Sequence, residues 1–246
     1  MKILITGAAS PLAQAIMAEL GEAHHVRLMD AEAVEAAGTE VARGSLLSQE
    51  DCWKAVRGID AVVITGEPPS DLPDDELARD QTLLDHATRG THNLCKAAVE
   101  AGVKRIVYGS TLDVFRSYPD DVYISELWKP MPEPDMPEMS RYLGELTCRE
   151  FARDHMISAT ALRLGKVVRE EEVGGLETDL MWVDIRDAAQ AFCIALERDT
   201  AHEVWWTRRW ALYHICADIA NPKYLISQAK SLGYAPVHSF SNHWPQ

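Results

Sequence analysis

Short apolar runs alternate with longer segments of helical spacing along most of this chain. The runs are apolar at consecutive positions rather than at every second one. Strands of that kind are buried on both faces, as in a parallel sheet covered by helices. The expected strands are 2–5, 25–29, 61–64, 105–108 and 159–164.

The segments between these runs predict amphipathic helices. Apolar residues recur in them at three- and four-residue steps, as Leu12, Ile16 and Leu20 do. The expected helices are 12–20, 49–57, 78–101, 140–155 and 184–196. This alternation indicates βαβ units, and therefore an α/β fold with a Rossmann-type doubly wound parallel sheet.

One segment departs from this alternation. Residues 119–137 are rich in Pro, Asp and Glu, with prolines at 130, 132, 134 and 137. Proline removes a backbone donor and clashes inside a helix, so a continuous helix is not expected here. We predict an irregular excursion over the carboxyl edge of the sheet.

The charge balance excludes some classes of partner. The 246 residues carry a formal net charge of −14 and no basic stripe, so nucleic acid is not an expected partner. No run of 18 apolar residues suggests a membrane span, and no signal peptide precedes the first strand. The five cysteines form no CxxC pair, which favours free thiols and a cytoplasmic location. The nine histidines show no ligand spacing, so no metal site is expected.

The turn between the first strand and the first helix is the candidate dinucleotide site. In such turns the first glycine allows a tight bend, the second lets backbone approach a pyrophosphate, and the third permits close packing. The helix N-terminus then offers free amides to the phosphates. Here Gly7 is kept, while Ser10 and Ala13 replace the second and third glycines. Ser10 places a side chain where phosphate would approach, so a purely structural turn is the alternative.

Asp30 strengthens the nucleotide interpretation. It ends the second expected strand, about twenty residues after the turn. A carboxylate there accepts hydrogen bonds from the ribose hydroxyls of NAD and repels the 2′-phosphate of NADP. We therefore predict NAD rather than NADP; the alternative is a solvated loop aspartate.

Several longer stretches carry a family resemblance. They are Gly-Ile-Asp-Ala-Val-Val at 58–63, the helix and strand at 90–108, Ser-Thr-Leu-Asp-Val-Phe at 110–115, Trp-Val-Asp-Ile-Arg-Asp at 182–187 and Leu-Gly-Tyr-Ala-Pro at 232–236. With these stretches the chain resembles the extended short-chain dehydrogenase/reductase (SDR) family, also called the NAD-dependent epimerase/dehydratase family.

The resemblance implies catalysis by a Ser or Thr, a Tyr and a Lys. In that family the Tyr exchanges a proton with a substrate hydroxyl or carbonyl, and the Lys lowers the Tyr pKa and holds the nicotinamide ribose. Thr111 stands at the Ser/Thr position. An alignment on Gly144-Glu145 places Arg141 at the Lys position and Pro137 at the Tyr position.

These replacements put the usual chemistry in doubt. Pro137 has no ionisable group, and the guanidinium of Arg141 can hold a ribose or phosphate but stays charged. A shifted alignment makes Tyr142 the catalytic Tyr, but it puts Leu146 at the Lys position. Ala87 also replaces the family's Asn.

The remaining expected cofactor contacts follow from the same resemblance. Ser45 and Leu46 stand where an Asp-Leu or Asp-Val pair contacts adenine. The complete set of expected cofactor-binding residues is Gly7, Ser10, Pro11, Leu12, Asp30, Ser45, Leu46, Thr65, Gly66 and Arg141.

The chain has only a short insert between Arg163 and Trp182, where many extended SDRs have a larger substrate lobe. We therefore predict one domain over 1–246, in which 165–246 forms a reduced C-terminal lobe. The aromatic stretch 204–210 packs that lobe, forms a homo-oligomer interface or floors a pocket.

Two functional hypotheses follow. The first is an NAD-binding SDR-like protein that resembles epimerases/dehydratases or uronate-type sugar dehydrogenases, with a degenerate active site formed by Thr111 and Arg141. Its substrate would be a sugar or sugar acid, in an oxidoreductase or isomerase reaction. The second is a pseudoenzyme: a non-catalytic nucleotide-binding, regulatory or scaffold protein. The missing Tyr favours the second hypothesis, and the family resemblance favours the first.

Overall fold

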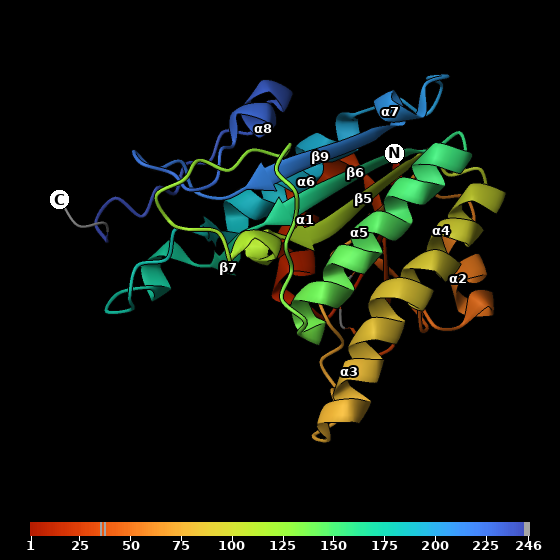
Figure 1. The fold of residues 1–246 in the computed structure, drawn as a ribbon. Helices are drawn as coiled ribbons and strands as arrows, with labels where there is room; N and C mark the ends of the chain where they lie inside the picture. The colour runs from red at the N-terminus through yellow and green to blue at the C-terminus, as the bar shows by residue number, and fades with distance from the viewer. Residues whose placement is uncertain (35, 37, 244–246) are drawn as a thin grey trace.

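Seven strands form one parallel sheet in the computed structural model, which describes residues 1–34, 36 and 38–243 (Figure 1). Their order across the sheet is β3-β2-β1-β4-β5-β6-β9, and each neighbouring pair is parallel. The strands are β1 (Lys2–Thr6), β2 (His25–Asp30), β3 (Glu40–Arg43), β4 (Ala61–Ile64), β5 (Arg105–Thr111), β6 (Ser158–Leu164) and β9 (Trp210–Ile215). The predicted Rossmann-type sheet is therefore confirmed.

Helices cover both faces of this sheet. Alternate residues of the strands point to opposite sides, so Ile3 and Ile5 pack toward α1 and α6 while Leu4 packs toward α2, α4 and α5. Figure 1 shows α2, α4 and α5 side by side over one face. The bounds are α1 (Pro11–Leu20), α2 (Gln49–Val56), α3 (Glu76–Asp85), α4 (Thr91–Glu100), α5 (Met136–Asp154) and α6 (Ile185–Glu197).

The helix predicted over 78–101 consists of two α-helices, α3 and α4, with a π-helical turn between them. A π-helical turn, His86–Gly90, joins α3 to α4 without a break in the helical path. Such turns are frequent at functional sites. This one brings Ala87 to the wall of a cavity described below.

The start of α5 corrects one prediction. The helix begins at Met136 rather than at 140, so Pro137 is helical and outside the irregular excursion. Pro137 lies in the first turn, where a backbone N–H has no intrahelical acceptor and proline is tolerated. Asp135 caps the turn, because its carboxylate accepts from the amide of Glu138 at 3.3 Å.

Two strands of the large sheet were not predicted. β3 is mostly exposed and contains Glu40 and Arg43, so it lacks the apolar run expected of a buried strand. β9 lies at the other edge, where Trp210, Ala211 and Tyr213 are only half-buried. Edge strands carry a weaker apolar pattern because one side faces solvent.

The aromatic stretch before β9 divides between surface and core. Val204, Trp205 and Trp206 are exposed, so the packing interpretation is wrong for these three residues. Trp210 packs against the core beneath α5. The guanidinium of Arg209 is buried and donates to the main-chain oxygens of Ala152 and Arg153, which ties the short helix α7 (Trp206–Arg209) to the end of α5.

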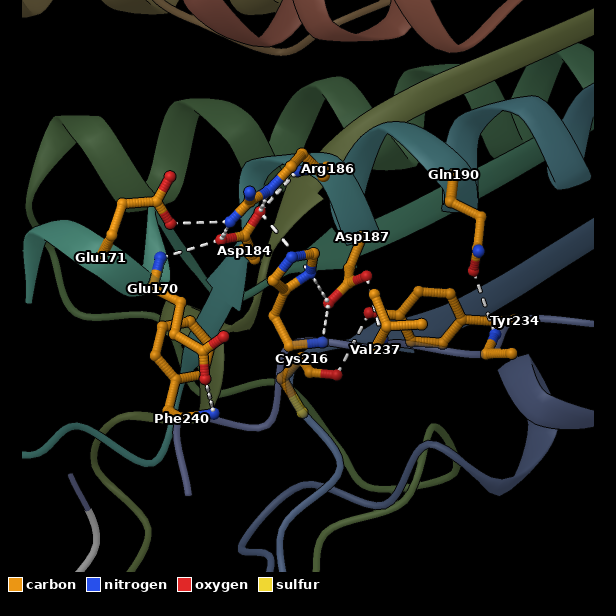
Figure 2. A network of polar contacts seen from close by, with 12 residues as sticks. Glu170, Glu171, Asp184, Arg186, Asp187, Gln190, Cys216, Tyr234, Val237 and Phe240 are labelled. Carbon is orange, nitrogen blue, oxygen red and sulfur yellow. Dashed lines mark hydrogen bonds and ion pairs between the residues drawn. The ribbon is translucent and has the colours of Figure 1, made fainter. Parts of the chain in front are cut away.

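Buried carboxylates hold together the part of the chain that we predicted as a reduced C-terminal lobe, 165–246 (Figure 2). It contains the parallel pair β7 (Lys166–Val168) and β8 (Trp182–Asp184), together with α8 (Ser227–Leu232). Asp187 accepts from the backbone amides of Val237 and His238 at 3.1 and 3.0 Å. An alanine in place of Asp187 would leave both amides without their acceptor.

We therefore expect Asp187→Ala to lower the free energy of unfolding by about 1.5–3 kcal/mol, the usual range for hydrogen bonds to a charged group. Urea denaturation at pH 7 measures the change. Glu197→Ala removes an exposed carboxylate at the far end of α6 and serves as the control. Equal stability of the two variants would contradict this role of Asp187.

Two kinds of site are absent from the described part of the chain. No helix there is both long enough and apolar enough to cross a bilayer. The same residues contain no cluster of three or more His, Cys, Asp or Glu side chains placed to hold a metal ion.

Candidate functional site

The carboxyl ends of β1, β4 and β5 meet in a region where glycines allow the chain to pack closely. Gly7 has a φ of +67°, and a Cβ there would lie 2.5 Å from Thr65 Oγ1. Gly66 has a φ of +74°, and a Cβ there would lie 1.7 Å from the carbonyl oxygen of Gly109. Two connections leave the sheet in opposite directions between β1 and β4, where open α/β sheets bind ligands.

Ser10 folds back onto the turn that follows β1. Its hydroxyl donates to the carbonyl of Gly7 at 2.7 Å and accepts from the amide of Ala13 at 3.2 Å. It is thus an N-cap of α1, and its hydroxyl is directed at the turn. Pro11 has no N–H, so the first helical turn offers a phosphate fewer donors than a glycine-rich turn does. The amide of Leu12 is one of the donors that remain.

Asp30 lies beside this turn, at the end of β2. One carboxylate oxygen accepts from the amide of Ala9 at 2.9 Å, and the other accepts from the amide of Glu32 at 3.0 Å. A carboxylate can accept about four hydrogen bonds, so two positions remain for ribose hydroxyls. The turn and the carboxylate therefore fit the adenosine half of a dinucleotide.

The next expected contacts lie along the same edge. Leu46 is buried, and its carbonyl accepts from the Asn93 side chain at 3.0 Å. The Ser45 hydroxyl accepts from the amide of Leu47 at 3.2 Å, so it stabilises a local turn. Thr65 donates to the carbonyl of Thr6 at 3.1 Å, which links β4 to β1 beneath the crevice.

Two neighbouring cavities open beyond this crevice. The smaller, of about 150 Å³, is lined among others by Gly66, Ala87, Pro137 and Glu138. The larger, of about 800 Å³, extends toward the C-terminal lobe and is lined by Thr111, Arg116, Lys166 and Lys223 among others. The walls of both cavities include Glu67, Asp113 and Arg141.

The Thr111 hydroxyl already has a partner in this structure. It donates to Asp113 Oδ2 at 2.8 Å and accepts from the Asp113 amide at 3.1 Å. Arg116 also pairs with Asp113. The candidate catalytic hydroxyl is therefore directed at a carboxylate on the wall shared by the two cavities.

Arg141 lies between the crevice and both cavities. One of its terminal nitrogens donates to the carbonyl of Ser110 at 3.1 Å and lies 3.9 Å from a carboxylate oxygen of Glu67. Tyr142, the alternative candidate, instead packs on Arg163: the guanidinium carbon of Arg163 lies 5.9 Å from the centroid of the Tyr142 ring. Of the two candidates, Arg141 is the one that lines both cavities, and its assignment to the Lys position stays a prediction.

Glu145 anchors α5 to the sheet beneath the site. It accepts from Ser110 Oγ at 2.6 Å and from two guanidinium nitrogens of Arg163 at 2.9 and 2.7 Å. Both charged side chains are only 3% exposed. This buried network sets the position of α5 relative to β5 and β6, and with it the position of Pro137, Glu138 and Arg141.

Comparison with known proteins agrees with this geometry. The profile of the NAD(P)H-binding family matches residues 7–172, well over half of the chain. The chain belongs to the NAD(P)H-binding family. Its match runs from the turn after β1 to the first part of the C-terminal lobe, so it includes the crevice and most of both cavity walls.

Named relatives of this NAD(P)H-binding protein include one sequence and two solved structures. An NAD-dependent glucose-6-phosphate dehydrogenase from Haloferax volcanii is 26% identical over 95% of this chain and 92% of its own. A mutant uronate dehydrogenase from Agrobacterium tumefaciens, complexed with NAD, superposes with a TM-score of 0.77 at 18% identity over 100% of this chain and 90% of its own.

The second solved structure is the UDP-N-acetylglucosamine 4-epimerase from Bacillus cereus, with a TM-score of 0.75 at 19% identity over 98% of this chain and 95% of its own. The predicted resemblance to SDR proteins is confirmed by these matches. The chain carries an NAD-binding domain of that fold.

No motif in the sequence singled out Glu138. This side chain lines the smaller cavity directly after Pro137, and the residue is 5% exposed. The pattern Asp135-x-x-Glu138 suggests only a helix cap, in which Glu138 would turn back toward the helix N-terminus. Its place on the cavity wall depends on the approach of α5 to the turn that follows β5.

Proposed function

We propose that this NAD(P)H-binding protein is an NAD-dependent dehydrogenase that acts on a hydroxyl group of a sugar or sugar acid. The observation that carries the proposal is the pair of cavities that continues the dinucleotide crevice and shares Asp113 and Arg141. A polyhydroxy substrate requires both donors and acceptors on its walls, and both are present. The named relatives act on such compounds and support this class.

The residues that would hold NAD lie along the carboxyl edge. Gly7 and the turn to Leu12 would receive the diphosphate, Asp30 the adenosine ribose, Ser45 and Leu46 the adenine, and Thr65, Gly66 and Arg141 the nicotinamide half. Bound NAD⁺ supplies a hydride acceptor. The protein's own residues must bind and orient the alcohol and remove its hydroxyl proton.

Lys166 is the best candidate for an acidic group of the substrate. It lines the larger cavity, it is half-exposed, and its ammonium lies 4.0 Å from Asp179, which is a loose ion pair. Lys223, by contrast, is buried and bound to Asp120 at 2.7 Å. A substrate carboxylate or phosphate could therefore displace Asp179 from Lys166 at low cost.

The proposal also covers the role of residues 165–246 and the cellular location of the protein. Residues 165–246 would complete the substrate site within one domain over 1–246. All five cysteines are free thiols, which supports a reducing, cytoplasmic location.

A second function is favoured by one specific observation. In the predicted alignment Pro137 stands at the Tyr position, and the Thr111 hydroxyl donates to Asp113 rather than to open space, so neither expected hydroxyl is available to a substrate. A nucleotide-binding protein without catalysis would be compatible with this arrangement.

A binding and turnover experiment separates the two functions. We expect millimolar NAD⁺ or NADH to raise the melting temperature, because a ligand at 100 times its Kd stabilises a protein by about 2.7 kcal/mol. NADP⁺ should raise it less. NADH formation at 340 nm with hexoses, hexuronates and hexose phosphates then reports dehydrogenation.

Asp30→Asn tests the cofactor assignment. The amide oxygen still accepts from Ala9, but the charge that repels a 2′-phosphate is gone. We expect NAD⁺ binding to weaken by about tenfold, a loss of about 1.4 kcal/mol, and the preference over NADP⁺ to shrink. Asp60→Asn, at the opposite edge of the sheet, is the matched control.

The outcomes are distinct. No thermal shift with any of these nucleotides would overturn cofactor binding. NAD binding without oxidation of any sugar would select the second function.

A further inference from the structure

Two buried polar atoms in the first turns of α5 have no hydrogen-bond partner among the described residues. They are Glu138 Oε2, an acceptor, and Arg141 Nε, a donor. An unpaired buried polar atom destabilises the folded state, and native proteins keep few of them. Both residues line the smaller cavity, so the unpaired atoms point to a ligand.

The two atoms are complementary to one hydroxyl group. Residues three apart on a helix lie on the same face, and both residues line the smaller cavity, so Glu138 and Arg141 present an acceptor and a donor to the same space. A hydroxyl can donate its proton to the carboxylate and accept from the guanidinium at the same time. Among the described residues, no other side chain fills this role.

We propose that Glu138 accepts the proton of the substrate hydroxyl, in the role that a tyrosine has in related proteins, and that Arg141 orients the hydroxyl oxygen. This inference rests on the proposed dehydrogenase function. The O–H bond breaks, its proton moves to the Glu138 carboxylate, and its electron pair completes the carbonyl double bond. The hydrogen on the same carbon leaves with its electron pair to NAD⁺.

The charges around Glu138 suit this role. Burial, followed by the negative charges of Asp113 and Asp135, raises the pKa of Glu138 to about 7, while Arg116 opposes the rise. Arg116 lies 3.7 Å from the other carboxylate oxygen, and Glu67 and His86 line the same cavity. A carboxyl group with a pKa near neutrality can both take up and return a proton during turnover.

The first test compares turnover. We expect Glu138→Gln to lower kcat by about 10²–10⁴-fold, the usual contribution of a general base, while the Kd for NADH changes less than twofold. Glu138→Asp should keep part of the activity. Glu133→Gln removes an exposed carboxylate from the preceding loop and should leave kcat within twofold.

The second test requires no turnover. The pKa of Glu138 is raised above its unfolded value of about 4.3, so ionisation of this group costs stability as pH rises from about 4.3 to 7, and the full cost persists above pH 7. We therefore expect the melting temperature of Glu138→Gln, relative to wild type, to be higher at pH 8 than at pH 4.5. A merely structural Glu138, stabilised by Arg116, predicts the opposite sign.

The failure modes can be told apart. Turnover within threefold of wild type in Glu138→Gln, or a relative melting temperature that is lower at pH 8, would overturn the role of Glu138 and leave the dehydrogenase proposal intact. A wild-type protein that binds no NAD, or oxidises no sugar, would overturn the dehydrogenase proposal, and the role of Glu138 with it.

Discussion

Glu145→Leu is expected to lower the free energy of unfolding by about 3–5 kcal/mol, because it leaves the guanidinium of Arg163 buried without its counter-charge. Arg163 is 3% exposed, and it donates two of its hydrogen bonds to Glu145. The Ser110 hydroxyl loses its acceptor as well. Urea denaturation at pH 7 measures the loss.

The double variant Glu145→Leu with Arg163→Met distinguishes two quantities: the destabilisation caused by an unpaired buried charge, and the net stabilisation contributed by the ion pair. Replacing both partners of a buried ion pair with apolar side chains is often neutral. We expect the double variant to recover most of the stability that the single variant loses. Additive losses would show instead that the network itself stabilises the fold.

An exposed ion pair provides the control for this cycle. Glu50 and Lys54 lie one turn apart on α2, 2.7 Å from each other, and both are largely exposed. Surface pairs contribute about 0–1 kcal/mol, so Glu50→Leu should change stability little. A loss of the same size at Glu50 and Glu145 would mean that burial does not decide the effect.

The strands in the middle of the sheet could be predicted because burial on both faces makes them apolar throughout. β4 was predicted with its observed bounds, 61–64, since every residue in it is buried. The edges could not be predicted in this way. β3 pairs with β2 through its main chain, and its exposed side chains carry no apolar signal.

The site was predictable to a similar degree. Asp30 and the turn at Gly7 come together at one edge because both end parallel strands, and that follows from the order of elements. The position of Ser10 did not follow from sequence, because its hydroxyl could point into the crevice or onto the turn. Glu138 required the tertiary packing of α5 against the turn after β5.

Among glycine-to-alanine substitutions, Gly66→Ala is expected to lower the free energy of unfolding most. A left-handed backbone costs a residue with a Cβ about 1–2 kcal/mol, and overpacking costs about 1–3 kcal/mol more. Here the new Cβ would lie 1.7 Å from the Gly109 carbonyl oxygen, which is main chain and cannot rotate away. Total losses of about 2–5 kcal/mol follow.

Gly58→Ala is the matched control, because Gly58 has a φ of +69° but nothing within 4 Å of a Cβ. It should therefore lose only the backbone contribution, and the difference between the two variants isolates the contact between the ends of β4 and β5. Relief of that contact must move the chain at the neighbouring Thr65, whose side chain lies against Gly7 in the crevice. NADH affinity should therefore fall in Gly66→Ala and persist in Gly58→Ala; equal affinities would show that the crevice tolerates displacement of the β4 end.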